Sequence, residues 1–306
     1  MNIFITGGAG YVGTKLTKAL LNYEQVDKII IYDNLSRNNF NLFLGKKFLH
    51  PHKVQFVNGD LLDTRKVRKL LEGVDFVYHL AAKVTTPFDN NDAHFHEQVN
   101  HWGTSELVMA MEETKIKKFV YTSSTSVYGA SDDFVNEQTL PDPKTIYGIS
   151  KLRGEEHVRR LFEKMNTYIL RCGNVYGYSK SMRFDAVINR FMFDANFNHR
   201  ISIHGNGDQS RAFIHVDILT GLLAKFIVQP VPSGIYNVVD KNVKVIEIAE
   251  LIRDIYEDLE LIFINQHLKL RELKVRPESM LREFIDFSNP LNLKEELKLF
   301  KDRFAF

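Results

Sequence analysis

Met1-Asn-Ile-Phe-Ile-Thr-Gly-Gly-Ala-Gly-Tyr-Val-Gly13 is the stretch that decides the fold of this chain. An apolar, β-prone run over residues 2–6 breaks directly into a glycine-rich turn, and Leu16, Leu20 and Leu21 follow at helical spacing. Glycine lets the backbone approach a pyrophosphate, and the free N–H groups of the first helical turn point at it. The stretch therefore predicts a strand, a phosphate-binding turn and the start of a helix.

An acidic residue stands where a dinucleotide site requires one. The next apolar run, 28–32, ends at Asp33, which is twenty residues after Gly13. A carboxylate at this distance receives the ribose hydroxyls of the adenosine half. Glycines also occur in ordinary strand-to-helix turns, so the glycine-rich turn alone does not indicate a dinucleotide site. Asp33 at the end of the next strand makes that interpretation more specific. Together they predict dinucleotide binding, and the carboxylate favours NAD because it repels a 2′-phosphate, although Arg37 lies close enough to weaken that preference.

The composition is that of an ordinary globular protein. The chain has 306 residues, of which 44% are hydrophobic and 25% charged, with a formal net charge of +2. The length and composition fit one large α/β domain, alone or with a smaller lobe. The small net charge does not indicate a nucleic-acid partner. The single Cys172 excludes a disulfide framework, the early first strand leaves no room for a signal peptide, and no apolar stretch approaches the ~18 residues that span a bilayer. We expect a soluble cytoplasmic protein with no membrane partner.

Strand and helix signals alternate through the first half of the chain. Strand-like runs lie at 2–6, 28–33, 53–58, 74–80, 117–123 and 167–172, and helical patterns at 11–22, 63–72, 93–113 and 147–165. Strands that are apolar throughout and separated by helices predict a parallel sheet covered on both faces. We therefore expect a Rossmann-type, doubly wound α/β fold with ligands bound beyond the carboxyl ends of the strands.

Asp60 follows the third strand-like run and has two interpretations. With Leu61 it could hold the adenine amino group and cover the ring with an aliphatic side chain. It could equally cap the helix predicted at 63–72, and Asp63 is just as suitable a cap. The sequence leaves the two roles open.

The fourth run ends in His79-Leu80-Ala81-Ala82, whose small residues let backbone pass close to a dinucleotide. The polar stretch 85–96 is predicted to be a loop over the site. His94, His96 and His101 lack a partnering Cys or carboxylate at ligand spacing, so we expect surface histidines and no metal.

Tyr147-Gly-Ile-Ser-Lys151 carries the chemistry. Residues four apart on a helix share one face, so the Tyr147 phenol and the Lys151 ammonium share one environment. A free phenol titrates near ~10, and a nearby ammonium, together with a cationic nicotinamide, is expected to lower that pKa. The Ser124 hydroxyl, at the end of a strand, can bind the same substrate oxygen. Tyr-x-x-x-Lys alone would indicate an exposed helix pair, but after a dinucleotide turn and a Ser-Ser strand end it predicts a proton relay beside a hydride acceptor.

Several further motifs occur in a fixed order along nearly the whole chain. They are Thr6-Gly-Gly-Ala-Gly-Tyr-Val-Gly13, with Gly-x-x-Gly-x-x-Gly spacing, Asp33-Asn-Leu35, Thr122-Ser-Ser124, Val127-Tyr-Gly129, Tyr147-x-x-x-Lys151, Leu170-Arg-Cys-Gly-Asn-Val-Tyr-Gly177, Gly205-Asn-Gly207, Arg211-Ala-Phe-Ile-His-Val-Asp217 and Val275-Arg-Pro277. The set resembles the extended short-chain dehydrogenase/reductases, in the branch of NAD-dependent sugar-nucleotide epimerases and dehydratases. The resemblance implies a Rossmann domain over 1–173 with a return of the chain near 212–240, a substrate lobe over 174–306 and a tightly held NAD.

The resemblance also implies roles for single residues. Tyr147 would be the base, Lys151 its pKa tuner and nicotinamide-ribose ligand, and Ser124 the hydroxyl partner. Asn100 would support Lys151 through water. The implied NAD-binding residues are Gly7, Gly10, Tyr11, Val12, Gly13, Asp33, Asn34, Asp60, Leu61, Leu80, Ala81, Ala82, Lys83, Asn100, Ser123, Tyr147, Lys151 and Val175.

The implied substrate-binding residues are Ser124, Asn174, Arg211 and Arg276. Asn174 would meet the substrate phosphate, and the two forked guanidinium groups would clamp the nucleotide diphosphate. An ordinary surface salt bridge is the alternative for each arginine. The resemblance further implies a homodimer, because the helices at 93–113 and 147–165 carry enough apolar positions to pair with a twin subunit.

The position before Val127-Tyr-Gly129 bears on the reaction. In the 4,6-dehydratases and decarboxylases of this family an acidic residue stands there, whereas this chain has Ser126, preceded by Thr125. A dehydratase needs a carboxylate to remove the C5 proton and an acid to expel the C6 hydroxyl, and a serine suits neither role. We therefore expect a nucleotide-sugar 4-epimerase, in which Tyr147 takes the 4-hydroxyl proton while a hydride passes to NAD and returns on the other face.

Alternatives and departures remain. A dehydratase could take its carboxylate from Asp132 or Asp133, and a decarboxylase, an NAD-dependent keto-sugar reductase and a dinucleotide-sensing scaffold are further possibilities. The usual Pro after Asn-Val-Tyr-Gly is Tyr178, the Gly-Asp after Arg-Pro is Glu278-Ser279, and Glu283 stands at the position that admits or rejects N-acetyl groups. These departures leave the sugar and the nucleobase open.

Overall fold

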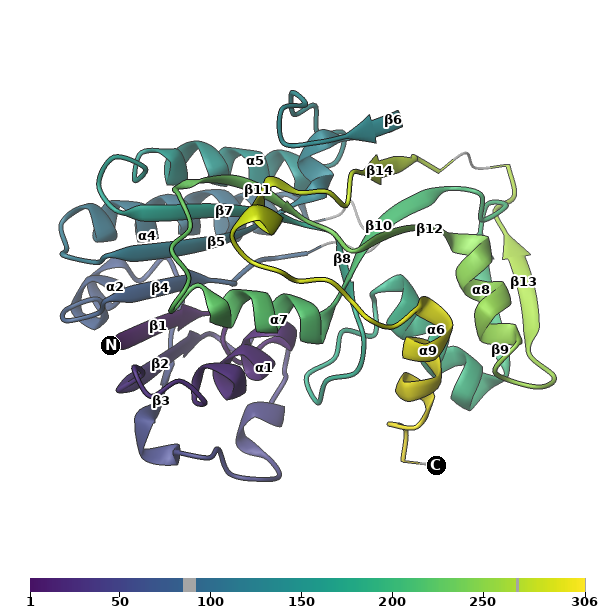
Figure 1. Ribbon diagram of the computed structural model, residues 1–306, viewed down its shortest axis with the longest axis horizontal. Helices are drawn as coiled ribbons and strands as arrows, with labels where there is room; N and C mark the ends of the chain where they lie inside the picture. The colour runs from purple at the N-terminus through teal and green to yellow at the C-terminus, as the bar shows by residue number, and fades with distance from the viewer. Residues whose placement is uncertain (85–91, 268–269, 306) are drawn as a thin grey trace.

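The computed structural model describes residues 1–84, 92–267 and 270–305 of the chain (Figure 1). The first half contains β1 (Asn2–Thr6), α1 (Tyr11–Leu20), β2 (Lys28–Asp33), η1 (Asn41–Phe43), η2 (Pro51–Lys53), β3 (Val54–Asn58), α2 (Thr64–Leu70), β4 (Phe76–His79), α3 (Ala93–His96), the π-helix η3 (Glu97–Trp102), α4 (Gly103–Glu112), β5 (Lys118–Ser124), η4 (Thr125–Tyr128), β6 (Ser131–Val135), α5 (Ile146–Arg159) and β7 (Asn166–Cys172). The second half contains β8 (Asn174–Tyr176), α6 (Val187–Asn198), β9 (Arg200–His204), β10 (Ser210–His215), α7 (Val216–Lys225), β11 (Gly234–Val238), β12 (Lys241–Lys244), α8 (Val245–Arg253), β13 (Glu260–Ile264), β14 (Leu273–Val275), η5 (Met280–Glu283) and α9 (Leu293–Lys301).

A seven-stranded sheet in the order β11-β7-β5-β4-β1-β2-β3 forms the larger part of the molecule. All of its strand pairs are parallel. The six predicted strands are present, each with its ends within two residues of the expected positions. The predicted Rossmann-type fold is therefore confirmed. The strand order reverses between β1 and β4, which places the switch point, and hence the ligand crevice, beside the glycine-rich turn.

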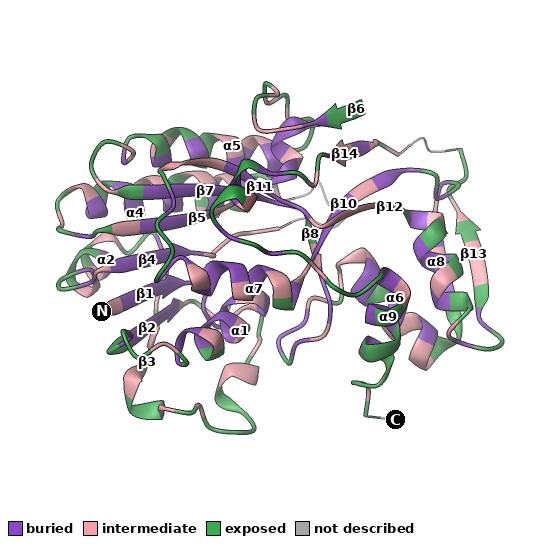
Figure 2. Ribbon diagram, in the orientation of Figure 1, coloured by how far each residue is buried: buried purple, intermediate pink, exposed green. Residues whose placement is uncertain are grey.

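Helices cover both faces of this sheet, as the apolar strands require. Leu16 and Leu20 of α1 share one buried cluster with Leu219 and Leu222 of α7. On the other face α2, α4 and α5 contribute the apolar side chains of a second cluster. Figure 2 shows the inner strands of the large sheet buried along most of their length, whereas the edge strand β3 is half-buried or exposed. The helix predicted at 93–113 is present but contains the π-helical segment η3 between two α-helical parts.

The second half of the chain forms three small sheets and also returns to the large one. β12, β10 and β8 make one sheet, β13 pairs with β9, and β14 pairs with β6. β11 then adds to β7 at the edge of the large sheet, within the region where the return of the chain was expected. The helices of the described residues include none that is long and apolar enough to cross a membrane.

Gly13 offers a test of the packing between the glycine turn and α1. A Cβ on Gly13 would lie 2.5 Å from the Gly8 Cα, whereas one on Gly221 of α7 would meet nothing within 4 Å. We expect Gly13→Ala to lower the free energy of unfolding by roughly 1–3 kcal/mol, because backbone must move. Gly221→Ala, the matched control, should raise it by about 0.5–1 kcal/mol through helix propensity. Urea unfolding measures both, and equal effects would contradict this account of the turn.

Candidate active site

The glycine-rich turn is packed too closely for side chains. Gly7 has a φ of +68°, and its N–H donates to the Tyr32 carbonyl at 2.8 Å. A Cβ on Gly7 would lie 2.6 Å from the Ala81 nitrogen beyond β4. No side chain caps α1, whose N-cap is Gly10. The uncapped N–H groups and the bare turn fit a pyrophosphate, so these residues suit the dinucleotide predicted from the sequence.

Asp33 lies at the carboxyl end of β2 and stabilises this turn. Its carboxylate accepts the Ala9 N–H at 3.0 Å and the Leu35 N–H at 2.8 Å. Burial raises the pKa of Asp33, and the two hydrogen bonds oppose that shift. Each carboxylate oxygen retains a lone pair for a ribose hydroxyl. Arg37 instead pairs with Asp185, with 3.7 Å between nitrogen and oxygen.

The two interpretations of Asp60 differ in their geometry. Asp63 is the N-cap of α2, because its side chain accepts the Lys66 N–H at 3.2 Å. Asp60 is exposed and binds the Leu62 N–H at 3.0 Å and the Asn34 amide at 2.8 Å. The capping role therefore belongs to Asp63. Asp60 and Asn34 meet at the carboxyl ends of β3 and β2, beside the turn, and their contact with adenine or ribose stays a prediction.

Leu61 follows Asp60, and its predicted contact with an adenine ring stays a prediction. Its side chain is 7% exposed and lies against α4, where a Cβ on Gly103 would be 3.0 Å from it. Leu61 therefore packs mainly into the interior. The next predicted segment, Leu80 to Lys83, is half-buried beside Gly7.

Asn100 links this segment to the catalytic helix. Its side chain accepts the Lys83 N–H at 2.9 Å, donates to the Lys83 carbonyl at 2.8 Å, and donates to the Ser150 hydroxyl of α5 at 3.0 Å. Asn100 is fully buried in the π-helix η3. It thus contacts α5, the helix of Lys151, while its support of Lys151 through water stays a prediction.

The prediction of surface histidines is wrong for His96. His94 is exposed, and His101 binds Glu97 at 2.8 Å, but His96 is 1% exposed. Its ring lies edge-on to Tyr147 with 6.0 Å between centroids. The stretch around His96 was assigned to a polar loop, whereas α3 turns this one side chain inward. In the described part of the chain, no group of three or more His, Cys, Asp or Glu side chains could hold a metal.

Ser124, Tyr147 and Lys151 come together at the carboxyl end of β5. The N-cap Thr145, which accepts the Gly148 N–H at 3.0 Å, starts α5 just before the tyrosine. Ser124 lies close enough to Tyr147 for its side chain to oppose the effect of burial on the pKa of Tyr147. Lys151 is 1% exposed, and its ammonium lies 4.2 Å from the centroid of the Tyr121 ring. The structure therefore brings together the three residues predicted to act as a proton relay.

The pKa of Tyr147 departs from the expectation. Burial raises it, while the Ser124 hydrogen bond and the positive charges of Arg183 and Arg37 oppose the shift. Burial also lowers the pKa of Lys151 to about 7. The expectation relied on the ammonium together with a cationic nicotinamide, and burial weakens the first of these two charges.

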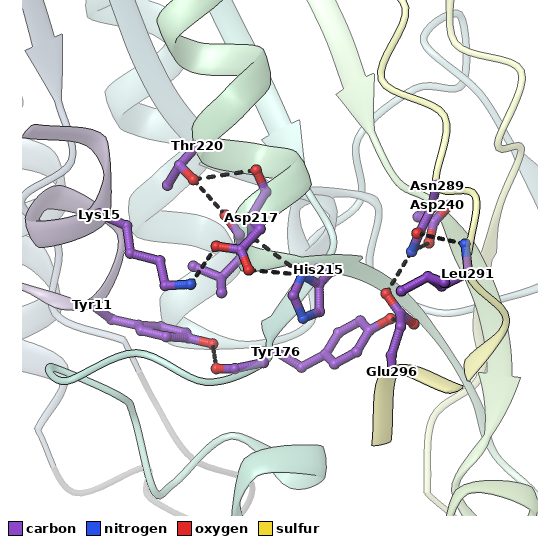
Figure 3. A network of polar contacts seen from close by, with 12 residues as sticks. Tyr11, Lys15, Tyr176, His215, Asp217, Thr220, Asp240, Asn289, Leu291 and Glu296 are labelled. Atoms are coloured by element: carbon purple, nitrogen blue, oxygen red, sulfur yellow. Dashed lines mark hydrogen bonds and ion pairs between the residues drawn. The ribbon is translucent and has the colours of Figure 1, made fainter. Parts of the chain in front are cut away.

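The loop 177–186 contributes residues that the sequence did not single out. Tyr11 donates its phenolic hydrogen to the Gly177 carbonyl, and the Thr14 and Ser181 hydroxyls lie 3.0 Å apart. Tyr11 thus attaches this loop to α1, next to the glycine turn (Figure 3). The loop places Arg183 where its charge acts on Tyr147. No local motif marks this role, because the partners lie far apart in the sequence.

A second network joins α1 to the smaller sheets (Figure 3). Lys15 of α1 pairs with Asp217 of α7, and the Asp217 N–H donates to His215 at 3.2 Å. Tyr176 donates its hydroxyl to Glu296 of α9 at 2.5 Å. Asp217 belongs to the motif expected near the nucleotide diphosphate. In the structure its carboxylate binds Lys15 of α1.

The predicted substrate residues lie on neighbouring strands. Asn174 donates its amide to the Ala212 carbonyl at 3.0 Å, and Val175 is half-buried on the same strand. Arg211 donates to the Ser210 and Arg271 carbonyls, and burial lowers its pKa. Arg276 is exposed just beyond β14, which packs against β10. A surface ion pair was the alternative role for each arginine, and neither forms one with any residue that the structure describes. Their predicted binding of a diphosphate stays a prediction.

The carboxylates that a dehydratase might use lie elsewhere. Asp132 and Asp133 are exposed on β6, where they and the hydrogen-bonded Glu272 raise the pKa of Lys274. Glu283 is exposed on η5. Burial raises the pKa of Tyr236, and the nearby negative charge of Glu283 raises it further. Its role in admitting or rejecting a substrate group stays a prediction.

Comparisons with known proteins agree on one family. A model described as the NAD dependent epimerase/dehydratase family matches residues 3–238. The uncharacterized UDP-glucose epimerase YtcB of Bacillus subtilis is 34% identical over 233 residues, covering 73% of this chain and 72% of its own. The dTDP-D-glucose 4,6-dehydratase of Homo sapiens is 30% identical over 266 residues, covering 83% and 74%.

A solved structure extends this similarity over the whole chain. UDP-glucuronic acid 4-epimerase from Bacillus cereus, in complex with UDP-glucuronic acid and NAD, superimposes with a TM-score of 0.86. It is 25% identical in sequence, and the match covers 99% of this chain and 98% of that one. The relatives thus include both 4-epimerases and a 4,6-dehydratase.

Asp63 and Asp60 are expected to affect different properties, the first the stability of α2 and the second the affinity for NAD. Asp63→Ala should lower the free energy of unfolding by about 1 kcal/mol, because it removes the helix cap. Asp60→Ala should cost less stability but weaken NAD binding by up to about tenfold, the loss of one hydrogen bond. Urea unfolding and calorimetric NAD titration measure the two effects. If Asp60→Ala leaves NAD affinity unchanged, its predicted contact with the adenosine is wrong.

Proposed function

The chain belongs to the NAD-dependent epimerase/dehydratase family, and from this premise we propose that it is a nucleotide-sugar 4-epimerase. NAD is the cofactor, and the bound nicotinamide would supply a reversible hydride acceptor for the sugar. The observation that carries the proposal is the contact of Tyr147 with Ser124, beside Ser126 in place of an acid. This site can move one proton at the sugar hydroxyl and return it, which is what inversion at one carbon requires.

Each side chain has one task in this proposal. Tyr147 takes the proton of the 4-hydroxyl as general base and gives it back to the same oxygen after the sugar has turned. Ser124 orients that oxygen through its hydroxyl, while Lys151 and Arg183 stabilise the phenolate by their positive charge. The turn over residues 7–13 would hold the pyrophosphate of NAD, and Asp33 its adenosine ribose.

The substrate would be a nucleotide-diphosphate sugar. Asn174, Arg211 and Arg276 would bind its phosphates from the lobe that we propose over residues 174–306, and 1–173 would form the NAD-binding domain. Arg211 supports this role, because its guanidinium donates to the Ser210 and Arg271 carbonyls, which hold it in place. A diphosphate is the kind of group that such forked donors bind in pairs.

A 4,6-dehydratase is the second candidate, favoured by the similarity to the human enzyme. It requires an acid and a base besides Tyr147. Ser126 cannot serve as either at neutral pH, and Asp132 and Asp133 point to the exposed edge at β6. The physical chemistry of the site therefore favours epimerisation.

Incubation with a panel of nucleotide sugars, followed by NMR, tests the proposed function. Inversion at C4 with no net change in NAD supports the epimerase. Loss of water indicates the dehydratase, and loss of carbon dioxide a decarboxylase. Release of NADH with turnover indicates a dehydrogenase or reductase, and no reaction with any sugar favours a dinucleotide-sensing scaffold.

We also propose a homodimer formed through α3, η3 and α4. Phe95, Trp102 and Met109 follow one another at intervals of seven residues and are 54%, 61% and 42% exposed. All three are large apolar side chains exposed on one continuous helical segment. The contribution expected from α5 stays a prediction, and its exposed positions Arg153, Glu156 and Arg159 are charged.

Tyr147→Phe should lower kcat by about 10²–10⁴-fold, the usual contribution of a positioned general base. NAD should remain bound, because only a hydroxyl is lost. Tyr236→Phe is the matched control, since its phenol binds the Pro232 carbonyl at 2.9 Å at the edge of the sheet. Turnover of the nucleotide sugar found by the panel is the measurement. Near-normal activity of Tyr147→Phe would show that another group is the base.

Trp102→Glu should convert the dimer into a monomer, because it buries a charge in an apolar interface. Light scattering coupled to size-exclusion chromatography measures the mass. Leu140→Glu, at a position 85% exposed outside this helical segment, is the control and should leave the mass unchanged. A wild-type monomer would refute the proposed dimer, and a dimeric Trp102→Glu would refute the interface.

A further inference from the structure

The catalytic helix carries a buried carboxylate that the proposed reaction does not use. Glu155 follows Lys151 by one turn of α5, so both side chains lie on the face that packs against the sheet. Glu155 is 0% exposed and Lys151 is 1% exposed. A buried charge of this kind requires a partner, because desolvation alone would neutralise it.

Two side chains from neighbouring strands bind this carboxylate. Arg171 of β7 donates to it through two nitrogens, at 3.0 and 2.7 Å, and Ser123 of β5 donates its hydroxyl at 2.5 Å. Arg171 is itself buried and lies over the Tyr128 ring, 4.8 Å from the centroid. The carboxylate is therefore fixed in one position relative to α5, β5 and β7.

Close packing alone does not explain why the Glu155–Arg171 ion pair is buried here. Replacing a buried ion pair by apolar side chains of similar volume is often neutral or stabilising. Here a third buried charge, Lys151, lies one helical turn away, and Glu155 is the foremost side chain that opposes the effect of its burial. The carboxylate can thus favour the ammonium form of Lys151, which an apolar pair could not do.

The other groups around Lys151 on the sheet side carry no negative charge at neutral pH. Burial lowers the pKa of His79 on β4 to about 3, so this ring is neutral. Burial raises the pKa of Cys172 on β7 to about 12, and it raises that of Tyr121 on β5 well above its usual value. Both remain protonated.

On the helical side η3 brings the carboxylate of Glu97 to α5, where it pairs with the exposed Arg153 at 2.8 Å. α3 contributes His96, which faces the Tyr147 ring, and η3 contributes the uncharged amide of Asn100. η4 contributes Tyr128, whose hydroxyl donates to Asn237 at 2.8 Å, and α4 turns Ser105 toward His157 farther along the helix. Glu155 is thus the fixed negative charge close to Lys151.

We propose that Glu155 is a positioning residue for Lys151: held by Arg171 and Ser123, its carboxylate keeps the buried amine in the charged form that Tyr147 needs. This proposal rests on the proposed epimerase reaction, because that reaction is what gives Lys151 a catalytic role. Its test needs no sugar substrate, however, so the two proposals can fail separately.

The measurement is the titration of Lys151 in NAD-bound protein. Lysine labelled with carbon-13 at Cε reports protonation by NMR, and Lys151→Met identifies the resonance. The wild-type midpoint is expected at about 7. In Glu155→Gln/Arg171→Gln, which removes both charges of the pair, the midpoint should fall by about one pH unit or more. The single variant Glu155→Gln is less suitable, because it leaves Arg171 buried without its partner.

A matched pair elsewhere separates this effect from loss of stability. Glu296 is also a buried carboxylate that accepts a tyrosine hydroxyl and pairs with a cation, Lys241, at 2.7 Å. Glu296→Gln/Lys241→Gln should reduce stability and leave the Lys151 midpoint unchanged.

Glu155→Leu/Arg171→Met provides a second, apolar replacement and should show the same lowered midpoint. Its stability should be close to that of the wild type. An unchanged Lys151 midpoint in either folded, NAD-binding double variant would overturn the proposal and leave the pair a structural one.

Discussion

The close packing of α5 on β5 is the constraint on which the site depends. Gly154 has no room for a side chain, since a Cβ there would lie 2.4 Å from the Tyr121 hydroxyl and 2.8 Å from the Asn100 carbonyl. This approach removes Lys151 from water and sets its ammonium over the Tyr121 ring. Desolvation then acts on both members of the relay in opposite directions, raising the pKa of Tyr147 and lowering that of Lys151. Burial thus opposes the charged form of each group, so the base must obtain its strength from charges around it.

Much of the fold could be predicted because its signals are local. Each central strand is apolar along its length, and the glycine turn and the Tyr-x-x-x-Lys spacing lie within single elements. The parallel arrangement of the strands followed from the rules of α/β sheets rather than from particular contacts. For the same reason the three residues of the relay could be named from sequence, since a strand end and a helix face determine where they meet.

The remaining features depend on contacts between distant segments. His96 was expected at the surface, but the short helix α3 turns it toward Tyr147. Glu155 and Arg171 each read as ordinary charged residues, and only the packing of α5 on β7 shows that they bind each other. Residues predicted to bind ligands also have structural partners, as Tyr11 has in Gly177. Sequence spacing gives the position of a side chain on its element, and not the direction in which tertiary packing turns it.

The positive charge that a desolvated phenol needs comes from the loops around the site. Arg183 and Arg37 both oppose the effect of burial on Tyr147, and both contact the carboxylate of Asp185. Arg37 follows β2, which carries Asp33, whereas Arg183 belongs to the loop attached to α1 by Tyr11. Any movement of either loop changes the distance between these cations and the phenol, and with it the proton affinity of Tyr147. The chemistry is therefore coupled to the segments that surround the dinucleotide site, through charge rather than direct contact.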